Sequence, residues 1–251
     1  MTLRAGTSGY AFKEWKGAFY PPELPDAEWL GYYATRFPTV EINNTFYRMP
    51  KESVLREWSA RVPDGFTFSI KASQRITHHA RLKAECADAV DFLLRNTAVL
   101  GSSLGPILFQ LPPNLKQDLD RLKGFLGLLP DGRRYAIEFR HESWFDDAVF
   151  ATLRDRDVAF CVAEQDDFKC PVQSTASWGY LRLHRLDYDA GALGEWAKCI
   201  ATQPWSDSYI YFKHDEGVGS GPPAVDAFVK ACGEPAYRAF GGGVGYGRSC
   251  W

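Results

Sequence analysis

The chain has 251 residues, of which 45% are hydrophobic, 24% charged and 15% aromatic, and this composition excludes a disordered chain. Its 29 basic and 31 acidic residues leave a formal net charge of -2, so the molecule as a whole has no field that would attract a polyanion or an acidic membrane. A single α/β barrel can account for a chain of this length.

Eight short β-rich runs alternate with segments of helical periodicity, a pattern typical of βα units around a parallel sheet. The predicted strands cover residues 3–8, 39–43, 66–71, 106–111, 134–140, 157–163, 179–184 and 209–213. The predicted helices cover residues 27–36, 52–61, 84–100, 117–128, 145–154, 192–201 and 224–232, with none after the sixth strand. The sequence therefore predicts a single-domain, TIM-like (β/α) barrel of parallel strands and outer helices over residues 1–240, followed by a glycine-rich tail at 241–251.

Two of the predicted helices begin with residues that suit a helix start. Ser143 can cap the helix that leads to Arg154, because its hydroxyl can accept a hydrogen bond from a free main-chain N–H. Pro222 and Pro223 suit the first turn of the last helix, where a missing N–H costs little.

Cysteines and apolar runs indicate the compartment. The six cysteines form no CxxC pair and no metal-ligand spacing, so we expect reduced thiols. No apolar run has the length of a signal sequence or a membrane span. We therefore expect a cytoplasmic protein with no membrane partner.

Polar side chains end the inward-facing rows of six predicted strands. Side chains alternate along a strand, so in the run FTFSIK the residues Phe68 and Ile70 would pack under helices, while Ser69 and Lys71 would face the barrel axis. The inward rows end in Glu41 and Asn43, Lys71, Gln110, Glu138 and Arg140, Arg182 and His184, and Lys213. Because the carboxyl ends of all barrel strands open onto one face, we expect these groups to converge at a substrate-binding mouth. The alternative is a water-filled, salt-bridged barrel end without a function.

The loops after the strands add aromatic and hydrogen-bonding residues to this mouth. We expect Tyr47, His78, Asn114 and Trp144 there, where flat aromatic faces would suit a sugar ring or a nucleobase. Plain loop packing is the alternative for Tyr47 and Trp144. His78 is favoured over its neighbour His79, because two adjacent side chains of an extended segment cannot both point at one site.

A glycine-rich loop follows the last predicted strand. Asp215 stands at its start, and Gly217, Gly219 and Gly221 precede the last helix, where main-chain amides could hold an anion. A flexible connecting loop is the alternative.

Six segments together resemble the DUF72 (YecE-like) family. They are GTSGYAFKEWKGAFYP at 6–21, VEINNTFYRMP at 40–50, FTFSIKASQRITH at 66–78, ILFQLPP at 107–113, IEFRHESW at 137–144 and LRLH at 181–184. The resemblance covers the chain apart from its glycine-rich tail and implies a TIM-like barrel. The family's reaction is unassigned, so the resemblance implies no mechanism.

The chain departs from the family pattern at three places. Arg185 stands where family members commonly have glycine, and Lys213, His214 and Asp215 replace an asparagine-rich strand end. The later Asn-Ala pair appears as Asp226-Ala227. If the family's asparagines contact ligand, this member binds its ligand differently, with an extra positive charge.

Three classes of function fit these residues, and an enzyme is the first hypothesis because opposite charges held together tend to perturb pKa values. Glu41 and Glu138 would act in acid-base or nucleophilic chemistry, facing each other across the mouth like the carboxylates that flank a glycosidic bond. Lys71 and His184 complete the catalytic set. The predicted substrate-binding residues are Asn43, Tyr47, His78, Gln110, Arg140, Trp144, Arg182, Lys213 and Asp215. The expected activity is that of a hydrolase, an isomerase or a lyase on a small polar substrate, such as a carbohydrate or an anion, without a cofactor. Replacement of either glutamate by glutamine is then expected to abolish turnover without unfolding the barrel.

A metal-dependent phosphoesterase or isomerase is the second hypothesis, with ligands drawn from Glu41, Glu138, Asp166 and His184. The neighbouring cations count against it, since a unit charge about 4 Å from another costs about 4 kcal/mol at an effective dielectric near 20. The third hypothesis is a non-catalytic protein that binds a phosphorylated or carboxylated small molecule, or, less favoured, single-stranded nucleic acid. The sequence does not indicate an oligomeric state.

Overall fold

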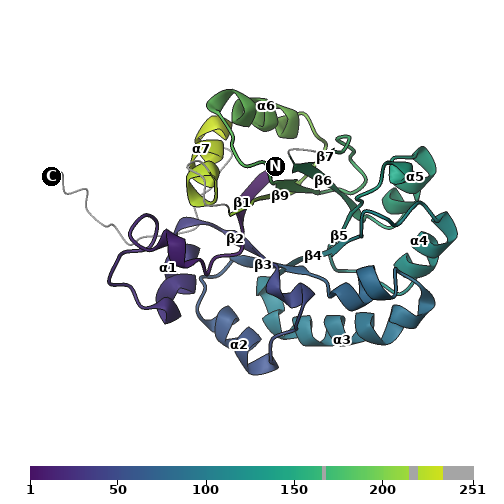
Figure 1. Cartoon of the computed structure of the whole chain (residues 1–251), viewed down its shortest axis with the longest axis horizontal. Helices are drawn as coiled ribbons and strands as arrows, with labels where there is room; N and C mark the ends of the chain where they lie inside the picture. The colour runs from purple at the N-terminus through teal and green to yellow at the C-terminus, as the bar shows by residue number, and fades with distance from the viewer. Residues whose placement is uncertain (166–167, 215–219, 234–251) are drawn as a thin grey trace.

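The structure of the chain is a computed structural model that describes residues 1–165, 168–214 and 220–233 (Figure 1). The barrel strands are β1 (Thr2–Ser8), β2 (Thr39–Ile42), β3 (Thr67–Lys71), β4 (Leu104–Gln110), β5 (Tyr135–Glu138), β6 (Ala159–Gln165), β8 (Gly179–Leu183) and β9 (Asp207–Phe212). Neighbouring strands pair in parallel, and the pairings of β5 with β6 and of β1 with β9 close the sheet. The predicted single-domain TIM-like barrel is confirmed.

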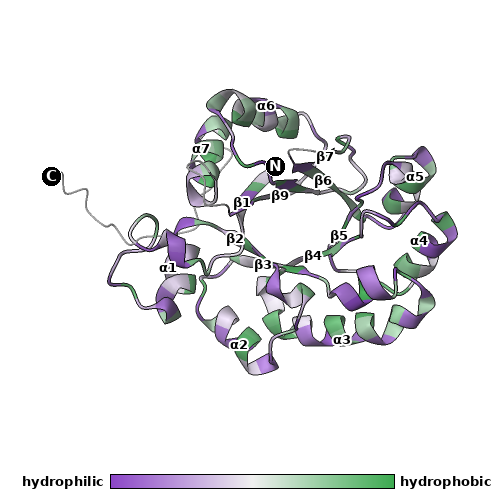
Figure 2. Cartoon of the chain, in the orientation of Figure 1, coloured by the Kyte–Doolittle hydropathy of each residue, from purple (hydrophilic) through white to green (hydrophobic). Residues whose placement is uncertain are grey.

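Helices surround this barrel (Figure 1). They are α1 (Trp29–Arg36), α2 (Glu52–Ala60), α3 (Ala87–Thr97), α4 (Leu119–Leu126), α5 (Asp147–Arg154), α6 (Ala190–Ala201) and α7 (Pro222–Cys232). Figure 2 shows that the outer helices carry both hydrophobic and hydrophilic residues, as expected for helices with one face on the sheet. Among the described residues, no helix is long and apolar enough to cross a membrane.

Several element boundaries differ from the prediction. β6 is followed by β7 (Phe168–Lys169), which pairs with it antiparallel, and the described residues between β6 and β8 form no helix, as predicted. Asp146 rather than Ser143 caps α5, accepting a hydrogen bond from the Ala148 N–H at 2.9 Å. The chain forms a further 3-10 turn over Glu142–Trp144, which places Ser143 before the helix and not at its cap.

The core has two layers, as the alternation of side chains predicts. The outer layer lies between the sheet and the helices and includes Phe68 and Ile70. The inner layer fills the barrel with Leu108, Ala136, Ala159, Cys161, Trp178, Tyr180, Tyr209 and Tyr211. Ser69 points into this interior, where its hydroxyl lies 2.6 Å from the Tyr211 hydroxyl. The barrel axis is therefore plugged, and the polar ends of the strands lie above the plug.

Close packing between strands requires glycine at one position of β1. Gly6 lies beside Thr39 of β2, and a Cβ on Gly6 would lie 2.1 Å from the Thr39 carbonyl oxygen. That distance is far below any van der Waals contact, so no other residue fits without moving a strand. The contact fixes the position of β2, which carries Glu41.

Candidate active site

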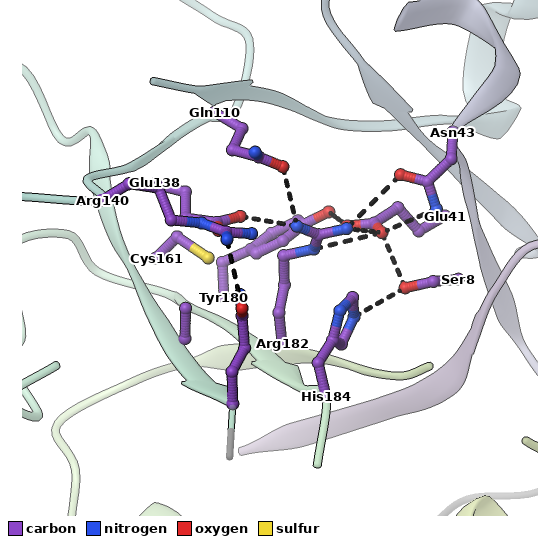
Figure 3. A network of polar contacts seen from close by, with 12 residues as sticks. Ser8, Glu41, Asn43, Gln110, Glu138, Arg140, Cys161, Tyr180, Arg182 and His184 are labelled. Atoms are coloured by element: carbon purple, nitrogen blue, oxygen red, sulfur yellow. Dashed lines mark hydrogen bonds and ion pairs between the residues drawn. The ribbon is translucent and has the colours of Figure 1, made fainter. Parts of the chain in front are cut away.

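Arg182, from β8, occupies the centre of the barrel mouth (Figure 3). Its Nε and Nη2 donate to Glu41 Oε1 at 3.2 and 2.9 Å, and Nη2 also lies 3.4 Å from Asn43 Oδ1. Its Nη1 donates to Glu138 Oε2 at 2.7 Å and to Gln110 Oε1 at 3.2 Å. A guanidinium has five N–H donors, and these five contacts engage all of them. Arg182 is only 5% exposed, so its side chain is part of the structure of the mouth. Because all its N–H donors are engaged, it has none left for a substrate.

Glu41, from β2, is fully buried and accepts hydrogen bonds on both carboxylate oxygens. Ser8 donates to Oε1 at 2.7 Å, and the Tyr180 hydroxyl donates to Oε2 at 2.7 Å. Burial by itself would raise the pKa of Glu41, but Arg182 and the hydrogen bonds from Tyr180 and Ser8 outweigh it and hold the pKa below the ordinary value. Glu41 is therefore ionised and does not store a proton.

Glu138, from β5, is the second fully buried carboxylate of the mouth. Arg140 Nε donates to its Oε1, and Arg182 donates to its Oε2 at 2.7 Å. Burial alone would raise the pKa of Glu138, but the charges of Arg182 and Arg140 outweigh it and hold the pKa below the ordinary value. Arg140 in turn donates through Nη1 to Gln165 Oε1 at 3.2 Å.

The guanidinium of Arg182 fills the space between the two carboxylates, because it hydrogen-bonds to both of them. A sugar ring cannot sit there, as it must when two carboxylates flank a glycosidic bond. The geometry therefore favours Glu41 and Glu138 as ionised anchors of Arg182 over the acid-base role predicted for them.

Lys71 is the last residue of β3 and lies on the same inward-facing row as Ser69. Its Nζ lies 4.5 Å from the centre of the Phe46 ring. Among the described residues, nothing forms a hydrogen bond or an ion pair with this amine. Burial and the charge of Arg182 lower the pKa of Lys71 to about 8, although Glu41 and Glu138 act in the opposite direction. Lys71 is thus a partly buried amine that is partly neutral near physiological pH.

His184 follows β8 and lies beside Glu41 through a shared hydrogen-bond partner. Its Nε2 is 3.0 Å from Ser8 Oγ, which also donates to Glu41. Burial, followed by the charges of Arg182 and Arg140, lowers the pKa of His184 well below the ordinary value, so the imidazole is neutral.

His78 lies in the short helical turn Arg75–His79 after β3. Its ring meets the Phe46 ring edge-on, with the centres 5.0 Å apart, and its Nδ1 lies 2.9 Å from Thr77 Oγ1. Burial and the charge of Lys71 lower the pKa of His78. Lys71 and His78 therefore share Phe46 as a neighbour.

Trp144 does not line the mouth, contrary to the prediction. It is fully buried, its ring stacks on Phe139 with the centres 4.7 Å apart, and its Nε1 donates to the Leu115 carbonyl oxygen at 2.7 Å. The side chain packs in the outer core layer, so it cannot touch a substrate.

Tyr47 lies on the rim and not in the central network. It is 74% exposed and lines a groove of about 620 Å³ together with Met49, Arg75 and the exposed Phe92. Its one described ring contact is with Phe46, edge-on at 5.0 Å. Tyr47 can therefore reach a ligand only if that ligand extends beyond the barrel axis.

The structure describes only part of the segment that follows β9 (Asp207–Phe212). Lys213 directly follows β9 and is exposed, whereas Asp215, Gly217 and Gly219 lie outside the described residues. Asp166, which the metal hypothesis requires, also lies outside them. Over the ranges that the structure does describe, no three His, Cys, Asp or Glu side chains are grouped to hold a metal ion.

Two of the departures from the family pattern can be placed. Asp226 lies on α7 and forms a largely exposed ion pair with Arg36 of α1 at 3.6 Å, away from the strand ends. Arg185 lies with its guanidinium carbon 5.2 Å from the centre of the Tyr188 ring.

Three residues of the site were not singled out from the sequence. Ser8 ends β1 in the way that the other polar residues end their strands, so the same alternation rule finds it. Tyr180 precedes Arg182 by two residues and shares its inward face. Phe46 gives no signal in the sequence, because its contact with Lys71 depends on the turn Asn44–Phe46 after β2.

The chain is similar to proteins of one family. A family model described as "Protein of unknown function DUF72" matches residues 4–239. The UPF0759 protein YecE of Escherichia coli (strain K12) is 35% identical over 117 residues, and the UPF0759 protein YunF of Bacillus subtilis (strain 168) is 33% identical over 141 residues. These matches cover 46% and 51% of this chain, and 43% and 48% of the relatives. The chain thus spans about half the length of the curated relatives it matches.

Two solved structures share the fold. A DUF72 family protein from Thermotoga maritima has a TM-score of 0.73 at 23% identity, covering 91% of this chain and 97% of that one. A DUF72 family protein from Enterococcus faecalis has a TM-score of 0.78 at 16% identity, covering 92% and 95%. At these identities the likeness shows a common barrel fold.

Proposed function

This chain belongs to the DUF72 family, whose description assigns no reaction, and we propose that it is an enzyme that acts on a small anionic substrate at the C-terminal mouth of the barrel. The single observation that carries the proposal is the amine of Lys71. It faces the barrel axis at the end of a strand, and none of the described residues pairs with it. In parallel barrels, substrates bind at this face.

The charges of the mouth favour an anion. The two carboxylates Glu41 and Glu138 are balanced by the two guanidinium groups of Arg182 and Arg140. Lys71 adds positive charge to a network that is otherwise neutral. Arg140 is 22% exposed, and its described hydrogen bonds use Nε and Nη1, so Nη2 can donate to a carboxylate or phosphate oxygen.

Acid-base chemistry at this site would use Lys71 and the neutral histidines. A general base works best with a pKa near the operating pH, and the pKa of Lys71 at about 8 meets this condition. Glu41 and Glu138 would hold Arg182 in place beneath the substrate. The activity that we propose is therefore that of a hydrolase, an isomerase or a lyase in which Lys71 accepts the proton.

Thermal unfolding in the presence of anions tests the binding step. Inorganic phosphate or lactate at ten times its dissociation constant stabilises a protein by about 1.4 kcal/mol, which raises the Tm by about 3 to 6 °C for a chain of this size. We expect this shift in the wild type and its loss in Lys71→Met. The matched control is Lys123→Met, which removes an exposed lysine of α4 and keeps the shift. A shift of equal size in Lys71→Met would refute the proposal.

We also infer a cytoplasmic location. The described cysteines Cys86, Cys161, Cys170, Cys199 and Cys232 are all free thiols, and three of them are buried. Free thiols are typical of a reducing compartment. The test is alkylation of the cells before lysis and again after denaturation, followed by mass spectrometry. We expect the two partly exposed cysteines to be modified by the first treatment and the three buried ones only after denaturation. Native disulfides would contradict the inference.

A further inference from the structure

We propose that Lys71 is a nucleophile that forms an imine with an anionic carbonyl compound. This inference rests on the proposed function, because it assigns a substrate class and a covalent step to the same site. It adds that the amine attacks carbon, whereas a general base would only accept a proton.

The position of Lys71 suits a nucleophile better than a structural cation. A buried or half-buried lysine that serves structure is paired with a carboxylate, since an unpaired buried charge is costly. Glu41 and Glu138 are the described carboxylates that act on Lys71, and both are engaged by Arg182. Nζ instead lies over the face of Phe46, where a cation–π contact replaces an ion pair and leaves the amine without a hydrogen-bond acceptor on that side. Lys71 is the last residue of β3, so the strand fixes the backbone from which its side chain extends.

Burial and the charge of Arg182 favour the neutral, nucleophilic form of the amine. Burial is the larger cause, and the charges of Glu41 and Glu138 act in the opposite direction. A pKa of about 8 leaves about a quarter of the amine neutral at pH 7.5, against about one part in a thousand for an ordinary lysine. Burial together with a second cationic group is a known way to activate a lysine for imine formation.

The step balances without any redox partner. The nitrogen lone pair of Lys71 forms a C–N bond while the carbonyl π bond breaks, and a proton moves from nitrogen to oxygen to give a carbinolamine. Loss of that oxygen as water, with the C=N bond formed in its place, gives the imine. The products are the imine and one water molecule, with no change in oxidation state.

His78 is placed to move the proton in this step. It shares Phe46 with Lys71, and the charge of Lys71 acts on its pKa. Its Nδ1 is held by Thr77, and no described residue hydrogen-bonds to Nε2. The carboxylate or phosphate group of the substrate would meet Arg140, which follows β5, two strands along the sheet from Lys71 at the end of β3.

Reductive trapping tests the imine. The protein is incubated with pyruvate and sodium borohydride, digested, and its lysine peptides are mapped by mass spectrometry. We expect the adduct, which has the mass of pyruvate less one oxygen atom, on Lys71 in large excess over every exposed lysine. Lactate with borohydride is the matched control and gives no adduct, because it has no carbonyl group to attack. Adducts spread over exposed lysines, with Lys71 unmodified, would overturn the inference.

A second variant separates the imine from anion binding. Lys71→Arg keeps the positive charge but has no amine that forms an imine, so we expect it to retain stabilisation by pyruvate and to lose trapping. Repeating the trap with dihydroxyacetone phosphate shows whether a phosphorylated carbonyl compound is also accepted. If pyruvate and lactate stabilise the wild type equally and no adduct forms on Lys71 with either carbonyl compound, the proposed function stands and the imine is refuted. If neither stabilises the protein and no adduct forms, both are refuted.

Discussion

Glu138→Gln distinguishes an anchor from an acid-base group. Both oxygens of Glu138 accept from arginines, and the side chain is fully buried, so an amide nitrogen in place of one oxygen would face an N–H donor. Breaking one side of a buried ion pair costs about 3 to 5 kcal/mol, and because glutamine keeps one acceptor we take about 3 kcal/mol. For a chain of this size that loss lowers the Tm by about 6 to 12 °C.

Urea unfolding followed by circular dichroism measures this loss. The matched control is Glu142→Gln, which changes an exposed glutamate in the next turn of the chain and is expected to stay within about 0.5 kcal/mol of the wild type. Adding Arg182→Met to Glu138→Gln is expected to cost less than the sum of the single changes, because the two residues share one interaction. A Glu138→Gln variant as stable as the control variant would refute the anchor role and return the acid-base role to first place.

Three further predictions concern the residues around this network and its support. Lys71→Met is expected to be more stable than the wild type at pH 7: the folded-state pKa of about 8 lies below that of the unfolded chain, so the wild type carries the full penalty below pH 8 and loses it as the pH rises towards 10.5. Urea unfolding from pH 7 to 10 checks this, and a variant less stable than the wild type at pH 7 would contradict it. Tyr180→Phe removes a 2.7 Å hydrogen bond to buried Glu41 and is expected to cost about 1.5 to 3 kcal/mol in the same assay, where no change would show that the bond contributes nothing. Gly6→Ala is expected to prevent folding or lower the Tm severely, because its Cβ would lie 2.1 Å from a main-chain carbonyl oxygen, whereas Gly124→Ala in α4 has open space and is expected to gain about 0.5 to 1 kcal/mol. Equal effects of the two alanines, measured by thermal unfolding, would show that the strand contact is not the cause.

The sequence predicts the barrel because its signals are local. Alternation in FTFSIK places Ser69 and Lys71 on the axis, and the structure has them there. Strand ends are equally local, so the convergence of Glu41, Glu138 and Arg182 follows from the fold class alone.

The pairing of charges within the mouth depends on distances across the barrel, and no local pattern contains them. Arg140 lies two residues from Glu138 in the sequence and pairs with it, but Arg182 comes from β8 and bridges Glu41 and Glu138 across the mouth. The direction of a loop side chain is equally hard to predict. Trp144 is an example, because an aromatic residue just after a strand can face the mouth or the core. Its ring stacks on Phe139 in the core, a choice made by tertiary packing.

The tyrosine-rich inner core layer closes the barrel below the mouth. Trp178, Tyr180, Tyr209 and Tyr211 close the axis beneath the charged network, so nothing that enters can pass through to the other end. For the proposed enzyme, a product would then leave by the route along which the next substrate molecule arrives. Product and substrate would compete for this route, so a product that keeps its anionic group is expected to be a competitive inhibitor.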